Sequence, residues 1–281
     1  MLLKFTKMHG LGNDFIVFEA PTDEFIPTTK QLQALANRRT GIGFDQALVL
    51  QPPRQPNTDV FYRNFNADGS EVEQCGNGAR CIASLVAKKL GLRRALRMDT
   101  VGGKVDAQVH SDGTVSLDMG EPNFNPAALP FDAAHMLPLY PLQVGAQQIE
   151  IGAVSMGNPH AVWRVPSVMS APVDTVGAAV ENHPRFANRV NVGFMEVVAR
   201  DHIRLRVFER GVGETQACGT GACAAVAVGR QLDWLDGTVN VDFPGGRAIV
   251  SWQGPGTHLW LTGPAVTVFE GQIELSELQR E

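Results

Sequence analysis

The sequence predicts an α+β fold with two pseudo-symmetric domains, each a mostly antiparallel sheet wrapped around a central helix, and an active site in the cleft between them. Two observations support this prediction. The chain matches itself at one fixed offset, and each copy combines alternating, strand-like segments with one apolar helix. At 281 residues the chain is long enough for two domains.

One offset of 143 residues aligns the two halves of the chain and carries Cys75 onto Cys218. It holds without a gap from residue 63 to residue 120. A chance match of glycines does not explain it, because charged, aromatic and cysteine residues match as well. The matched pairs include Arg63 with Arg206, Phe65 with Phe208, Glu71 with Glu214, Gly76 with Gly219, Asp99 with Asp242, and Gly102-Gly103 with Gly245-Gly246. With a two-residue shift, Gly12-Asn13 pairs with Gly157-Asn158.

The repeat sets the predicted domain boundaries. Residues 1–120 together with 264–281 form the expected N-terminal domain, and residues 121–263 form the C-terminal domain. The stretch 121–126 contains two prolines, which block regular strand pairing, so it is the expected linker. Gly263-Pro264 ends the second copy, and the chain after it is expected to return to the first domain.

The expected strands and helices follow from the spacing of apolar residues. Alternation predicts strands at 59–65, 104–109, 114–119, 203–208 and 248–252. Each copy has one apolar helix that begins just after its cysteine and runs through 79–90 or 222–232. The first ends at Lys88-Lys89-Leu90-Gly91, a cationic last turn followed by a glycine stop. The second is apolar on every side, which indicates a buried helix.

Composition and charge exclude several classes of protein. The formal net charge is −5 and the basic residues are scattered, so neither nucleic acid nor a membrane surface is an expected partner. No apolar run approaches the roughly 20 residues that span a bilayer. Charged residues stand where a signal peptide needs its apolar stretch, so we expect a cytoplasmic protein.

Cys75 and Cys218 stand at the same place in the two copies, each followed by Gly-x-Gly and then a helix. A helix start lowers the pKa of a thiol from about 8.5 toward neutrality. Its unpaired N–H groups, here at Gly76, Asn77, Gly219 and Thr220, form a nest for a carboxylate. A thiolate and a thiol on opposite sides of one carbon could remove a proton from one face and return it to the other.

The other two cysteines, Cys81 and Cys223, fall inside the apolar helices and are expected to be ordinary buried residues. A zinc site is a weaker alternative, because the spacings are Cys-x5-Cys and Cys-x4-Cys and the second cysteine is out of register in the repeat. Neither Gly-x-Gly-x-x-Gly nor a Gly-Lys-Ser/Thr phosphate loop is present. No metal and no nucleotide is therefore expected.

Four motifs carry a family resemblance across essentially the whole chain. Residues 66–70 leading to 75–81, and 209–215 leading to 217–222, resemble the two cysteine motifs of diaminopimelate epimerases. Residues 8–15 and 156–160 resemble two further motifs of that family. The resemblance implies epimerisation of LL-diaminopimelate to the meso form, without pyridoxal phosphate or another cofactor, in the synthesis of lysine and peptidoglycan precursors. It also implies a homodimer.

The resemblance assigns roles to individual residues. Cys75 and Cys218 are the implied catalytic pair, and His160 and Glu209 are implied to tune their ionisation. Arg210 suits a distal carboxylate and Glu209 an ammonium group. The implied substrate contacts are Asn13, Gln46, Asn66, Gly76, Asn77, Asn158, Asn191, Glu209, Arg210, Gly219 and Thr220.

Two alternatives remain open from the sequence. A proline racemase or a phenazine-type isomerase shares the duplicated architecture, but the asparagines and the Glu209–Arg210 pair suit a second charged end that proline lacks. A non-enzymatic protein that responds to metal or redox state through its four cysteines is the alternative from a different class.

Overall fold

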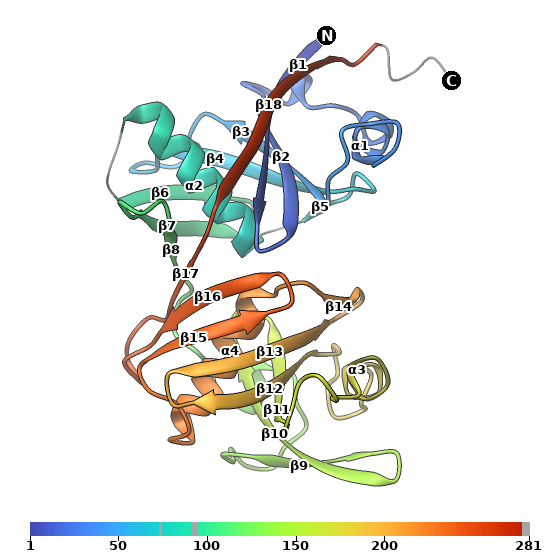
Figure 1. Cartoon of the computed structure of the whole chain (residues 1–281), viewed down its shortest axis with the longest axis vertical. Coiled ribbons are helices and arrows are strands. Elements are labelled where there is room, and N and C mark those ends of the chain that lie inside the picture. The colour runs from blue at the N-terminus through green and yellow to red at the C-terminus, as the bar shows by residue number, and fades with distance from the viewer. Residues whose placement is uncertain (73–74, 92–94, 277–281) are drawn as a thin grey trace. The chain divides into compact units, whose positions relative to one another are not determined.

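The structure is a computed structural model that describes residues 1–72, 75–91 and 95–276 (Figure 1). The chain divides into two compact units. Unit 1 contains Met1–Leu117 and Gly263–Glu281, and unit 2 contains Asp118–Thr262. The predicted boundaries after residues 120 and 263 lie close to these bounds. Residues 277–281 of the predicted N-terminal domain lie outside the described residues.

Unit 1 is a twisted sheet with one helix packed against its strands and a second, shorter helix outside. Its strands run in the order β18-β1-β2-β3-β4-β6-β7-β8, and β5 is added beside β4. The pairs β2–β3 and β4–β6 are parallel, and the others are antiparallel. The elements are β1 (Leu2–Gly10), β2 (Asn13–Glu19), η1 (Asp23–Phe25), α1 (Thr29–Ala36), β3 (Gln46–Gln51), β4 (Val60–Asn66), β5 (Glu71–Val72), α2 (Gly76–Leu90), β6 (Ala95–Thr100), β7 (Gly103–Val109), β8 (Val115–Asp118) and β18 (Val266–Glu274).

Unit 2 has the same arrangement. Its order is β9-β10-β11-β12-β13-β15-β16-β17, with β14 beside β13, and its parallel pairs are β11–β12 and β13–β15. The elements are η2 (Pro126–Ala128), β9 (Tyr140–Val144), β10 (Gln147–Ser155), β11 (Pro159–Arg164), α3 (Val173–Glu181), β12 (Asn191–Ala199), β13 (His202–Glu209), β14 (Gly213–Thr215), α4 (Gly219–Gln231), β15 (Thr238–Phe243), β16 (Gly246–Ser251) and β17 (Trp260–Gly263).

The strand register carries the same offset as the sequence. Val60 pairs with Met98 in unit 1, and 143 residues later Ile203 pairs with Val241 in unit 2. An ion pair is repeated as well. Arg63 Nε lies 2.6 Å from Glu71 Oε1, and Arg206 Nε lies 2.6 Å from Glu214 Oε1. The duplication is therefore visible both in the matched residues of the sequence and in the matched pairing of the strands.

The helices α2 and α4 begin directly after the two cysteines, as predicted, and three residues earlier than the apolar pattern alone indicated. Glycines at the first positions of both helices hide the pattern there, because glycine is a poor helix former. Ala79 N donates to the Cys75 carbonyl oxygen at 2.8 Å, and Ala222 N donates to that of Cys218 at 3.0 Å. Each cysteine is thus an N-cap residue in an extended conformation.

The ends and surroundings of these helices also follow the sequence. Gly91 ends α2 in the left-handed conformation, with φ of 63°, after Lys88 and Lys89 in the last turn. Residues 221–229 of α4 are all buried, which confirms the buried helix that was predicted. The expected linker is only partly irregular, because Asn123 forms a bridge with Ser155 before η2 begins.

In unit 1 the chain after Gly263 forms β18, which pairs antiparallel with β1 from Leu2–Glu274 to His9–Val266 (Figure 1). Among the described residues, no helix is long and apolar enough to cross a membrane.

Candidate active site

In unit 1 the Cys75 side chain lies at the start of α2, where it is partly buried. Its Sγ donates to Asn13 Oδ1, with 3.5 Å between the two atoms. The Nδ2 of Asn77, two residues into the helix, donates to the same oxygen at 3.4 Å. Asn13, Cys75 and Asn77 are therefore brought together around one carbonyl oxygen.

Gln46 and Asn66 lie on neighbouring strands of the same unit. Gln46 is the first residue of β3 and Asn66 the last of β4, and the two residues are paired in register. Gln46 Nε2 donates to Asn66 Oδ1 at 2.9 Å. Gly76 opens α2 with little around it, since a Cβ added there would meet only Leu117 Cδ1, at 4.0 Å. Space is thus open beside the first residue of α2.

In unit 2 a chain of hydrogen bonds leads from His160 to Cys218. Asn158 Nδ2 donates to Thr220 Oγ1 at 3.4 Å, so its Oδ1 accepts from His160 Nε2 at 3.0 Å. The Thr220 hydroxyl lies 3.6 Å from Cys218 Sγ. Burial and, to a smaller extent, the positive charge of Arg210 together lower the pKa of His160 to about 3. His160 is therefore a neutral imidazole that carries its proton on Nε2.

Burial raises the pKa of the Cys218 thiol well above its usual range. The negative charge of Glu209 raises it further, and these effects exceed the lowering by Thr220 and by the Gly221 N–H. The expectation that the helix start brings this pKa toward neutrality is therefore wrong for Cys218. Only 5% of the residue is exposed, so loss of hydration outweighs the helix terminus.

Glu209 and Arg210 follow one another at the end of β13. Glu209 Oε1 accepts from Thr215 Oγ1 on β14 at 2.5 Å. The exposed Arg210 donates through Nη1 to the carbonyl oxygen of Asn188 at 3.0 Å.

Asn191 is buried, and both ends of its side-chain amide form hydrogen bonds with backbone groups. It donates to Pro159 O at 3.1 Å and accepts from Arg210 N at 3.0 Å. Asn191 therefore holds the Arg210 turn in place.

Most of the predicted site residues occur as equivalent pairs in the two units, whereas Arg210 aligns with Ala67 and His160 with Phe15. The 143-residue offset relates Asn66 to Glu209, Gly76 to Gly219 and Asn77 to Thr220. The shifted offset of 145 relates Asn13 to Asn158 and Gln46 to Asn191, and the parallel pairs β2–β3 and β11–β12 keep that register, with Phe15 opposite Gln46 and His160 opposite Asn191.

Sequence reasoning missed residues that hold the predicted site residues in place through hydrogen bonds and ion pairs. Asp45 Oδ2 accepts from Asn13 Nδ2 at 2.9 Å, and Arg38 Nη2 lies 2.7 Å from Asp45 Oδ1. Arg80 Nη2 donates to Asn77 Oδ1 at 2.6 Å. One signal was visible in the sequence, since Arg80 is a cation within an otherwise apolar stretch of helix.

Cys81 and Cys223 are both fully buried in α2 and α4, as predicted. Burial raises the pKa of Cys81 to about 12, which keeps it a neutral thiol. Among the described residues, no group of three or more His, Cys, Asp or Glu side chains could hold a metal ion.

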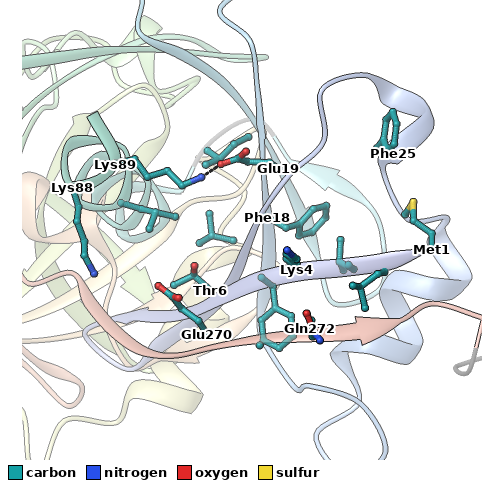
Figure 2. A pocket seen from close by; sticks show the side chains of 17 residues that line it. Met1, Lys4, Thr6, Phe18, Glu19, Phe25, Lys88, Lys89, Glu270 and Gln272 are labelled. Carbon is teal, nitrogen blue, oxygen red and sulfur yellow. Dashed lines mark ion pairs between the residues drawn. The ribbon is translucent and has the colours of Figure 1, made fainter. Parts of the chain in front are cut away.

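A large hollow lies elsewhere on unit 1. Figure 2 shows this cavity of about 990 Å³, which is lined by residues of β1, β2, β18 and the end of α2. Lys89 forms an ion pair with Glu19 at its rim. None of the predicted site residues lines it.

Comparison with known proteins decides the family. The family model for diaminopimelate epimerase matches residues 5–125 and 152–268. The chain belongs to the diaminopimelate epimerase family. Diaminopimelate epimerases of Stutzerimonas stutzeri and Pseudomonas aeruginosa are 52% and 51% identical to it. Each alignment covers 98% of this chain and 100% of the relative.

Solved structures outside the family share its fold. A hydroxyproline epimerase from Agrobacterium vitis has a TM-score of 0.68 at 15% identity, over 97% of this chain and 92% of that one. A probable proline racemase from Agrobacterium radiobacter has a TM-score of 0.69 at 14% identity, over 99% and 94%. At these identities the likeness shows the fold alone, and it confirms the predicted α+β class.

Proposed function

We propose that this protein epimerises LL-2,6-diaminopimelate to meso-diaminopimelate, with Cys75 and Cys218 as its two acid/base groups. One observation carries the proposal. The two cysteines occupy equivalent N-cap positions in the two copies of a duplicated unit, within a chain about half identical to relatives named diaminopimelate epimerase. The reaction would serve the synthesis of lysine and peptidoglycan precursors.

The reaction needs one thiolate and one thiol. The thiolate removes the α-proton, leaving a carbanion beside the carboxylate, and the thiol donates its proton to the opposite face of the same carbon. After turnover the two sulfurs have exchanged protonation states. Burial and the charge of Glu209 favour the neutral form of Cys218, so we assign it the donor role for LL-diaminopimelate and assign Cys75 the base role.

The remaining residues suit the charges of the substrate. Backbone N–H groups at Gly76, Asn77, Gly219 and Thr220 can bind a carboxylate and stabilise the charge that develops in the transition state. Asn13, Gln46, Asn66 and Asn158 offer amides that donate or accept as each substrate group demands. The exposed Arg210 guanidinium suits the distal carboxylate, and Glu209 suits an ammonium group.

Two of the proposed residues act through their neighbours and not by direct contact with substrate. His160 is buried, and its hydrogen bonds lead through Asn158 and Thr220 to Cys218, which supports a role in setting the ionisation of that thiol. Asn191 holds the backbone of Arg210 and supports the distal binding group indirectly.

The experiment that tests this function is incubation of the purified protein with LL-diaminopimelate, without added pyridoxal phosphate or metal. Chromatography that separates the stereoisomers should show approach to a mixture of LL and meso forms. L-proline serves as the comparison substrate, because it lacks the second charged end and should not react. Racemisation of proline without turnover of diaminopimelate would overturn the proposal.

We further propose that the enzyme is a cytoplasmic homodimer. None of the four cysteines, all of which the structure describes, forms a disulfide, as is usual in a reducing compartment. Strand β18 carries three apolar side chains that are 40–56% exposed, Val266, Val268 and Phe269, and it borders the cavity of Figure 2. A second copy of the chain that packs against β18 would cover these residues.

A further inference from the structure

Arg80 is a fully buried arginine on helix α2 of unit 1. Its Nη2 donates to Asn77 Oδ1 at 2.6 Å, and its Nε donates to the carbonyl oxygen of Pro264 at 3.3 Å. Two glycines make room for its guanidinium. A Cβ at Gly263 would lie 3.1 Å from Arg80 Cζ, and one at Gly10 would lie 3.4 Å from Nη2. The packing of unit 1 is thus shaped around a buried cation.

The contact with Arg80 fixes the direction of the Asn77 amide. Because Oδ1 of Asn77 accepts from the guanidinium, its Nδ2 faces Asn13 Oδ1, which also accepts from Cys75 Sγ. Asp45 holds the other end of Asn13 by accepting from Nδ2 at 2.9 Å. Arg80 and Asp45 therefore hold the two amides from opposite ends and aim one carbonyl oxygen at the Cys75 thiol.

The repeat places different charged groups at two equivalent positions near the cysteines. The 143-residue offset relates Arg80 to Cys223, a fully buried residue without formal charge, and relates Glu209 to the neutral Asn66. Unit 1 thus has a buried cation on the helix of Cys75, where unit 2 has a cysteine. Unit 2 has a carboxylate beside Cys218, where unit 1 has an amide. A cation favours a thiolate and a carboxylate favours a thiol.

We propose that Arg80 is a positioning residue for Cys75 that orients Asn77, and that its buried positive charge favours the thiolate, in contrast to Glu209 at Cys218. The charge acts against the Asn13 carbonyl oxygen, which accepts from the Cys75 thiol and so favours the neutral form. The proposal rests on the proposed function and extends it, because it explains how two duplicated sites acquire different resting protonation states. Other ionisable groups interact with Cys75. Tyr62 on β4 and Cys81 on α2 respond to its charge, and Asp45 reaches it through Asn13.

The test is the rate at which iodoacetamide alkylates Cys75, measured without substrate across a range of pH. Cys218→Ser serves as the parent, and peptide mass spectrometry identifies the alkylated cysteine. Only the thiolate reacts, so the rate follows the thiolate fraction. We expect Arg80→Met to slow alkylation near neutral pH roughly tenfold, by moving the profile about one unit upward. Arg80→Lys, which keeps the charge and loses the planar fork, should recover part of the rate.

Arg63→Met is the matched control, since it removes a cation from the same unit that pairs with Glu71 on the sheet, and its profile should equal that of the parent. Each variant must keep native circular dichroism. If Arg80→Met does not fold, Arg80→Gln keeps a hydrogen-bond donor to Asn77 while it removes the positive charge, and it should also slow alkylation. A folded Arg80→Met or Arg80→Gln with the alkylation profile of the parent overturns the proposal. This readout needs no turnover, so failure of the proposed function would appear separately, in the assay with LL-diaminopimelate.

Discussion

The four cysteines differ in their surroundings more than in their sequence context. Cys75 and Cys218 are N-cap residues with hydrogen-bonding neighbours, whereas Cys81 and Cys223 are fully buried inside helices. We expect Cys75→Ala and Cys218→Ala each to lower the epimerisation rate by about 100-fold or more, because each removes an acid/base group. Cys81→Ala and Cys223→Ala should keep most of the activity. Rates for all four folded variants test this, and near-normal turnover by Cys75→Ala or Cys218→Ala would refute the two-base mechanism.

Glu209 controls the ionisation of Cys218 in this account. Its negative charge raises the pKa of the Cys218 thiol, so Glu209→Gln should lower that pKa and move Cys218 alkylation to lower pH. The measurement is the pH profile of Cys218 alkylation in a Cys75→Ser parent. Glu214→Gln, which breaks the ion pair with Arg206 on neighbouring strands, is the control and should leave the profile in place. An unchanged profile in Glu209→Gln would remove Glu209 from this role.

At the scale of single residues, the sequence predicted which side chains gather better than it predicted their charge states. The motifs indicated Asn13, Cys75 and Asn77, and the structure joins them around one oxygen. The direction of the Cys218 pKa was wrong, because burial depends on packing from distant strands that a helix-start pattern does not include. Asp45 and Arg80 were missed for a similar reason, since each acts through the amide of another residue.

At the scale of elements, helix α4 packs closely on strand β10 at Gly152. A Cβ at this position would collide with Val228, lying 2.8 Å from its Cγ2 and 3.1 Å from its Cβ. We expect Gly152→Ala to destabilise the protein by about 1–3 kcal/mol through overpacking. The shift of the urea unfolding midpoint measures this effect.

A second substitution tests whether that contact is the cause. Val228→Ala removes the colliding methyl groups, so the double variant should be more stable than the sum of the two single effects predicts. Gly193→Ala in β12 is the matched control, because its nearest new contact, Leu205 Cδ1 at 3.5 Å, is an ordinary one. Equal midpoints for Gly152→Ala and Gly193→Ala would contradict this packing.

The elements that could be predicted were those inside the repeat. Within the ungapped match, alternation predicted the strands that correspond to β4, β7, β8, β13 and β16, and the apolar stretches after the cysteines predicted both central helices. Inside the repeat, β5, β6, β14, β15 and β17 were not assigned, and outside it β1 to β3 and β9 to β12 were not assigned either. The strands outside it precede the ungapped region, and the offset changes from 143 to 145 before that region, so the repeat gave no reliable register there.

At the scale of the whole molecule, we expect a homodimer whose interface includes β18. Sedimentation of the full chain should give a mass near twice 30.4 kDa. Val268→Asp places a charge on the exposed face of β18 and should weaken the dimer, because burying an unpaired carboxylate is costly. Val198→Asp, at an exposed apolar position on β12 in unit 2, is the control and should leave the mass unchanged. A monomeric wild-type protein at assay concentrations would contradict the proposal.

The central claim, that two thiols serve one α-carbon from opposite faces, is tested most directly by epimerisation of LL-diaminopimelate in heavy water. The thiol that donates carries a deuteron from the solvent, while the other cysteine, as a thiolate, removes the substrate proton. At early times the meso product should therefore carry one deuterium at the inverted carbon, and recovered LL substrate should stay almost unlabelled. Equal labelling of recovered substrate and product would indicate a single base that exchanges with solvent, and would contradict the account.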